Sequence, residues 1–125
     1  MAGTLTISTL SDGTNSTSST NCIQGSAKAW VNFNGTGTVA IRASYNVSSI
    51  TDNGTGDYTV NFTNAFADAN YAWTVGGDGS GSRSNTLIYA KTNSTAPTAS
   101  ALRIQVMDDQ SAAVDPTYAC LAIFD

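Results

Sequence analysis

The chain has 125 residues, only 11% of them charged, with a net charge of −4 and neither histidine nor glutamate. A chain of this length forms one domain around one hydrophobic core, and its low charge leaves a neutral surface of serine, threonine, asparagine and glycine. Five scattered cations form no basic stripe, so we expect no nucleic-acid partner. No apolar run approaches the ~20 residues that span a bilayer, so we expect no membrane insertion.

The first 21 residues comprise a strand candidate and a polar tract over residues 11–21, which has the composition of a linker, a surface-running arm or a segment that only a partner orders. Leu5 and Ile7 alternate with threonine and serine, which predicts a strand over residues 5–10, and the polar tract that follows has nothing to bury. The basic segment and apolar core of a signal peptide are absent, so we expect the mature chain to begin at Met1 or Ala2. We predict an N-terminal strand and polar attachment arm over residues 1–21 and a body over residues 22–125.

The body alternates apolar and polar residues with the period of two that half-buried strands have, and helical periodicity is absent throughout. Asn34-Gly35 and Asp52-Asn53-Gly54 separate successive runs and tolerate the positive φ that hairpin turns require. We predict an all-β fold, an antiparallel, jelly-roll-like β-sandwich with an extended N-terminal arm. The body strands are predicted at residues 28–33, 38–49, 57–63, 70–75, 86–91, 101–107 and 118–124.

Two features of these strands point to an interface. The last strand is apolar on both faces, so it is either a central strand or a strand whose second face meets another subunit. Trp30 projects opposite to Val31 and Phe33, where it either packs under a loop or contacts a partner. The interface candidates are Leu5, Ile7, Trp30, Leu121 and Ile123.

The sequence offers little catalytic chemistry. Without histidine, neither serine nor cysteine has the usual general base. Asp108 and Asp109 are adjacent, so on a strand they point to opposite faces and we expect them to be solvated. Asp52 and Asp57 flank a glycine turn and are spaced to converge on a calcium ion, although turn capping is the interpretation we favour. We therefore expect no enzyme activity, no cofactor and no metal.

Two further motifs have structural interpretations. The glycine-rich run over residues 76–81 is followed by neither a lysine-serine pair nor a helix, so it is predicted to be a mobile hairpin tip and not a phosphate-binding loop. A disulfide between Cys22 and Cys120 is compatible with the predicted fold. Without a secretory signal, two buried free thiols are the interpretation we favour.

Three stretches of the sequence also carry a resemblance. They are residues 4–13 (TLTISTLSDG), 29–37 (AWVNFNGTG) and 49–62 (SITDNGTGDYTVNF). Together they resemble small tail-fibre-like proteins of tailed bacteriophages, especially aquatic ones. The likeness covers most of the chain, and it is specific over residues 28–75 and weaker after residue 76.

The resemblance implies a non-enzymatic virion protein, commonly trimeric, whose N-terminal segment attaches to the particle while the body faces outward. We therefore expect a tail-fibre or adhesin-like homotrimer, assembled into the virion in the host cytoplasm. Its arm contacts other virion proteins, and its loops present a neutral polar surface to a host surface glycan or a neighbouring virion protein. The chain lacks the long shaft of large fibres, so a capsid decoration (cement) protein remains an alternative. Trp30 and Trp73 also permit a free carbohydrate-binding module.

Overall fold

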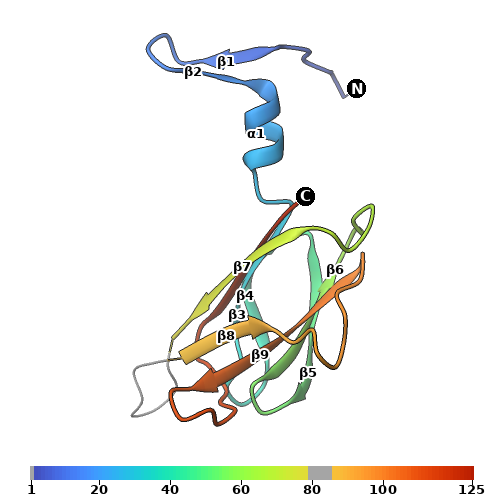
Figure 1. Cartoon of the computed structure of the whole chain (residues 1–125). Helices are drawn as coiled ribbons and strands as arrows, with labels where there is room; N and C mark the ends of the chain where they lie inside the picture. The colour runs from blue at the N-terminus through green and yellow to red at the C-terminus, as the bar shows by residue number, and fades with distance from the viewer. Residues whose placement is uncertain (1, 79–85) are drawn as a thin grey trace.

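The computed structural model describes residues 2–78 and 86–125. Strands dominate them and every strand pair is antiparallel, so the all-β prediction is confirmed (Figure 1). The N-terminal segment contains β1 (Thr9–Ser11), β2 (Ser16–Ser18) and the helix α1 (Ser19–Gly25). The body contains β3 (Ala29–Asn34), β4 (Ala40–Tyr45), β5 (Val47–Gly54), β6 (Asp57–Phe62), β7 (Ala72–Gly77), β8 (Thr86–Ala90), β9 (Ala101–Asp108) and β10 (Ala119–Phe124).

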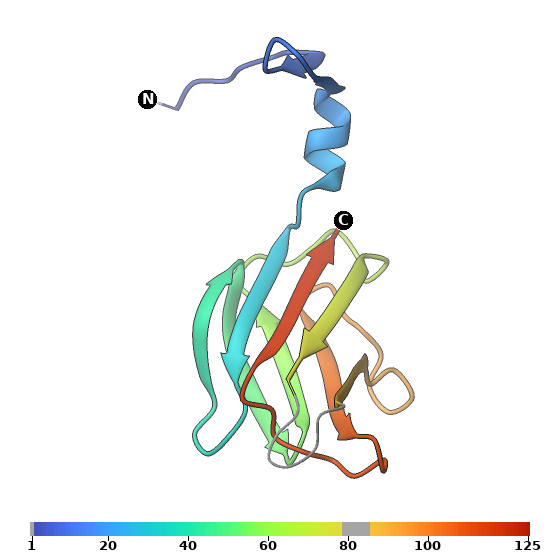
Figure 2. The same ribbon diagram turned by 90° about the vertical axis from the view of Figure 1, so that its left-hand side faces the viewer.

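The body strands form two four-stranded sheets that lie face to face (Figures 1 and 2). The first sheet has the order β4-β3-β10-β7, and the second has the order β5-β6-β9-β8. Hairpins join β3 to β4, β5 to β6 and β8 to β9 within a sheet. The other connections between body strands cross from one sheet to the other, so each sheet is built from strands far apart in the sequence.

The inner faces of the two sheets share one hydrophobic core. Phe33 of the first sheet meets Tyr58 of the second edge to face, with ring centroids 5.2 Å apart. Burial follows the period of two predicted from the sequence: in β6, Tyr58 and Val60 are buried and Thr59 between them is only half-buried. Burial of each such large apolar side chain stabilises the fold by about 1.5–3 kcal/mol.

One predicted strand is in fact two. The prediction of a single strand over residues 38–49 was wrong, because Asn46 has a φ of 54° and ends β4, after which β5 begins in the other sheet. Asparagine tolerates this left-handed backbone better than most residues. Its side-chain Oδ1 also accepts a hydrogen bond from the Asn64 backbone N–H at 2.8 Å. The change of sheet leaves Tyr45 exposed on an outer face.

The N-terminal segment contains a hairpin and a helix that the sequence analysis did not predict. Asp12 Oδ1 accepts hydrogen bonds from the backbone N–H groups of Thr14 and Asn15, which closes the turn between β1 and β2. Ser18 then caps α1 by accepting from the Asn21 N–H at 3.2 Å. None of the α1 residues is buried, so local capping and not apolar periodicity determines this helix.

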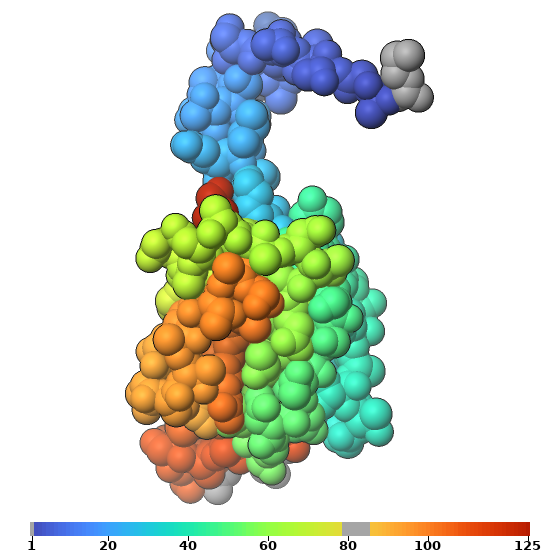
Figure 3. Space-filling model, turned by 90° about the vertical axis from the view of Figure 1, so that its right-hand side faces the viewer, coloured from blue at the N-terminus to red at the C-terminus, as the bar shows by residue number. Residues whose placement is uncertain are grey.

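The N-terminal segment projects from one end of the body (Figure 3). Residues 2–7 are extended and belong to no strand, and β1 begins only at Thr9, so the predicted strand over residues 5–10 is largely absent. Within residues 2–78 and 86–125, no helix has the length and hydrophobicity needed to cross a membrane.

Candidate functional site: two interaction surfaces

The first surface is the N-terminal apolar cluster, which we define as Leu5, Ile7, Leu10 and Ile23. The first two residues lie on the extended segment, the third on β1 and the last on α1, and they line a notch of about 380 Å³. Their exposure ranges from 39% to 82%. Apolar side chains gathered in this way, away from any core, are typical of a surface that a partner covers. The structure thus brings Leu5 and Ile7 together with two residues that the sequence analysis did not select.

Lys28 fixes the N-terminal apolar cluster to the body. Its Nζ donates hydrogen bonds to the backbone oxygens of Ile23 and Ser26, so it caps the C-terminal end of α1. Its backbone N–H donates to the Ile123 carbonyl of β10 at 2.7 Å. One residue therefore holds both the helix and the first sheet.

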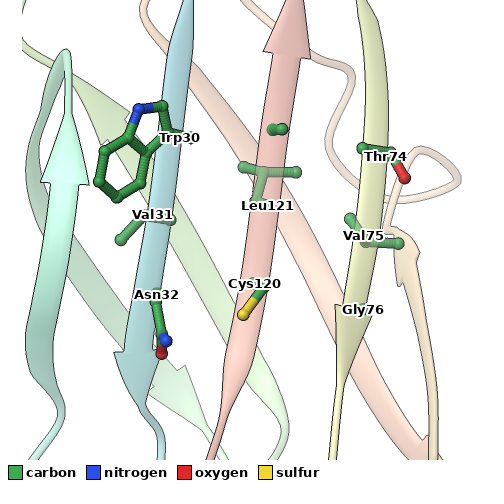
Figure 4. A pocket seen from close by; sticks show the side chains of 9 residues that line it. Trp30, Val31, Asn32, Thr74, Val75, Gly76, Cys120 and Leu121 are labelled. Atoms are coloured by element: carbon green, nitrogen blue, oxygen red, sulfur yellow. The ribbon is translucent and has the colours of Figure 1, made fainter. Parts of the chain in front are cut away.

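The second surface is the outer groove, a shallow depression of about 410 Å³ on the outward face of the first sheet (Figure 4). Its floor follows β10, where Cys120 and Ala122 are small and lie below their neighbours. Ala122 pairs in register with Trp30 on one side and with Thr74 on the other. The outward-facing residues that line the groove are Trp30, Asn32, Thr74, Gly76, Cys120 and Ala122.

Two aromatic side chains stand at the β3 and β4 side of the outer groove. Trp30 is 40% exposed, as predicted for a residue that projects opposite to Val31 and Phe33, and its indole lies flat against the sheet with one face outward (Figure 4). Tyr45 is directly opposite Trp30 on β4 and is 58% exposed. We call this pair of exposed aromatic residues the aromatic edge.

The predicted interface residues Leu121 and Ile123 lie elsewhere. The strand β10 is a central strand, paired with β3 on one side and with β7 on the other. This confirms the central-strand alternative of the sequence analysis. Its two large side chains point inward and are buried against the second sheet. They belong to the core because this chain's own second sheet covers them, and no partner subunit is needed to do so.

The carboxylates that were considered for calcium have separate tasks. Asp52 Oδ1 accepts from the Gly54 N–H at 2.9 Å, which confirms turn capping for this residue. Asp57 instead forms ion pairs on the outward face of the second sheet, with Lys91 Nζ at 2.5 Å and Arg103 Nε at 2.7 Å. The hydrogen bond from Arg103 is the main cause that lowers the pKa of Asp57 to about 2. No group of three metal-ligating side chains comes together in the described part of the chain.

Several other expectations need correction. Asp108 is buried and not solvated, because its Oδ1 accepts the backbone N–H groups of Gln110 and Ala112 in the turn after β9. Cys22 and Cys120 are free thiols, but both are exposed, since α1 buries no residue and β10 turns Cys120 outward. The predicted hairpin tip is described only as far as residue 78, and residues 79–81 lie outside the described ranges.

No protein-family model matches the chain, and no match was found among curated proteins or solved structures. The two surfaces and the sequence are therefore the basis for a functional proposal.

Proposed function

We propose that this chain is a non-enzymatic structural protein of a bacteriophage virion, tail-fibre or adhesin-like, in which the N-terminal segment is the attachment arm. The single observation that carries the proposal is the N-terminal apolar cluster, whose four large apolar side chains are 39–82% exposed. The resemblance of three sequence stretches to tail-fibre-like proteins supplies the context. The finer description of the body, a jelly-roll-like sandwich, is part of this proposal and is supported by two stacked antiparallel sheets joined by crossing connections.

Self-assembly follows from the same observation. A helix of seven residues is marginal by itself, and a partner that packs on α1 stabilises it. Burying each large apolar side chain of the cluster contributes on the order of 1.5–3 kcal/mol. We propose that three copies bring their clusters together, in agreement with the trimers that the resemblance implies.

Attachment to other virion proteins has a separate structural basis. The backbone of residues 2–7 is extended and belongs to no strand of this chain. An extended segment satisfies its backbone donors and acceptors when it joins the edge of a partner's sheet. We propose that this segment pairs with a neighbouring virion protein while the body faces the host surface.

The test uses the full chain with Leu5, Ile7 and Ile23 all replaced by serine. We expect the wild type to sediment as a trimer at micromolar concentration and to be present in purified particles, as measured by quantitative mass spectrometry. The triple variant should be monomeric and absent from particles, and its body should still unfold cooperatively in urea because none of the three residues lies in the core.

Leu87→Ser is the matched control, because Leu87 is an exposed apolar residue of β8 in the body. It should leave both assembly and incorporation unchanged. A monomeric wild type would refute the trimer, and normal incorporation of the triple variant would refute attachment through the arm.

A capsid decoration protein is the second candidate, because the described chain has one compact body and a short N-terminal segment with no shaft between them (Figure 3). The number of copies per particle separates the two placements. Hundreds of copies would indicate decoration of the head, whereas a few to tens would indicate the tail.

A further inference from the structure

We propose that the outer groove is a binding site for a neutral saccharide. The inference deepens the proposed host-facing role of the body and rests on it.

The aromatic edge suits the apolar face of a sugar ring. Trp30 lines the groove, and its indole lies on the β4 side of β3 with one face outward (Figure 4). Tyr45 lies opposite Trp30 on β4. A pyranose presents a face of C–H groups that packs on an aromatic face, which carries the negative side of the ring quadrupole. The small residues on the floor, Cys120 and Ala122, leave the space above β10 open for that ring.

The polar groups in the groove have unused hydrogen-bonding capacity. Asn32 is the next outward residue of β3 after Trp30, and its buried Oδ1 has no hydrogen-bond partner among the described residues. A buried acceptor without a partner is uncommon in folded proteins. Asn32 lines the groove, so a sugar hydroxyl that binds beside it is placed to supply the missing donor to this amide.

The charge of the groove selects a neutral ligand. None of the residues that line it is charged. The two cations of the surrounding strands are engaged elsewhere: Arg42 stacks on the Tyr118 ring, 4.1 Å from its centroid, and Lys28 caps α1. An apolar site with a few placed polar groups and no charge is complementary to a neutral saccharide and not to an anionic one.

The experiment measures binding to the full-length protein by tryptophan fluorescence and calorimetry. The probes are neutral oligosaccharides built from glucose, galactose, mannose or N-acetylglucosamine, and the comparison arm is sialylated and sulfated oligosaccharides. We expect at least one neutral probe to bind, with affinity lost by roughly tenfold or more in Trp30→Ala and roughly three- to tenfold in Asn32→Ala. Trp73→Phe is the control, since Trp73 is similarly exposed but does not line the groove.

Three results would overturn the inference: no binding of any neutral probe, unchanged affinity in Trp30→Ala, or a preference for the anionic arm. A fourth is dissociation of the oligomer in Trp30→Ala, because it would show that a second copy occupies the groove. A urea unfolding curve for each variant excludes loss of binding through misfolding. The triple serine variant of the arm should still bind the saccharide. Saccharide binding therefore tests this inference, and incorporation into particles separately tests the attachment proposal.

Discussion

The hydroxyl group of Tyr58 holds together the end of the body opposite to α1. Its single proton is shared between Asp115 Oδ1 at 2.6 Å and the Gly35 carbonyl at 3.1 Å, while the Gly56 N–H donates to the same carboxylate oxygen at 2.8 Å. The β3–β4 loop, the β5–β6 turn and the segment before β10 therefore meet around the Tyr58 hydroxyl and the Asp115 carboxylate. Glycine is required at position 35, because a Cβ there would lie 2.6 Å from the Tyr58 hydroxyl oxygen.

Replacing Tyr58 by phenylalanine should destabilise the protein by about 1–2 kcal/mol. The change leaves the buried ring in place but removes the donor to Asp115 and to the Gly35 carbonyl. The free energy of unfolding in urea measures the effect. Tyr45→Phe is the control and should change nothing, because this tyrosine is exposed; equal stability of the two variants would contradict the assigned role.

At the scale of single elements, α1 depends on contacts at its two ends. No residue of the helix is buried, so its stability comes from the Ser18 cap and from Lys28, which donates to the last carbonyl groups. A cation at the C-terminal end of a helix also interacts favourably with the helix dipole. The Lys28 side chain therefore contributes to holding the α1 part of the N-terminal apolar cluster at its C-terminal end.

We expect Lys28→Met to loosen α1 without unfolding the body. Loss of the cap should raise the hydrogen-exchange rates of the α1 amides by roughly three- to tenfold, since a cap contributes about 1 kcal/mol. NMR hydrogen exchange on the full chain measures this. Lys91→Met removes a lysine that pairs with Asp57, far from the helix, and should leave the α1 rates unchanged. Equal rates in wild type and Lys28→Met would show that the cap does not hold the helix.

Some of the strands could be predicted from the sequence, whereas the end of β4 and the helix α1 could not. Strands β6 and β10 follow from the alternation of their residues, because period-two burial is a local property of the chain. The end of β4 could not be predicted, since it depends on one left-handed residue, Asn46, and on its tertiary hydrogen bond to Asn64. The helix α1 was missed because capping determines it and apolar periodicity does not.

The candidate surfaces were predictable only in part. The exposure of Trp30 follows from its position between inward residues of β3, and the exposure of Leu5 follows from the polar tract around it. The sequence shows that both faces of the last strand are apolar, but not which partner covers each face. Leu121 is therefore a core residue that the pattern alone does not distinguish from an interface residue. Ile23 joined the cluster only through the fold of α1.

For the whole molecule, the shifted pKa values predict that the free energy of unfolding falls at both acid and alkaline pH. Asp57 joins β6 to Arg103 of β9 and to Lys91 after β8, and its pKa is lowered to about 2. The Tyr71 hydroxyl donates to two backbone carbonyls, and burial raises its pKa to about 12. Burial and the neighbouring Asp115 raise the pKa of Tyr58 as well.

The free energy of unfolding should therefore be greatest between acid and alkaline limits. The contribution of Asp57, about 2 kcal/mol, is fully present above the ordinary pKa of 3.8 and is lost as the pH falls toward about 2. The contribution of Tyr71 is present below the ordinary value of 10.0 and is lost as the pH rises toward about 12. Urea unfolding across this range tests both limits. Asp57→Asn should flatten only the acid limb, and an acid limb as steep as that of the wild type would exclude Asp57 as its source.

The position of the C-terminus has a practical consequence for labelling. The hydrogen bond between Lys28 and Ile123 places the end of β10 beside the base of α1 (Figures 1 and 2). A fluorescent protein or affinity tag fused after Asp125 would therefore emerge where the proposed trimer brings its copies together, and in that trimer it would crowd the assembly that it is meant to report. The turn at residues 36–38 lies at the opposite end of the body, where an inserted epitope would point away from those neighbours.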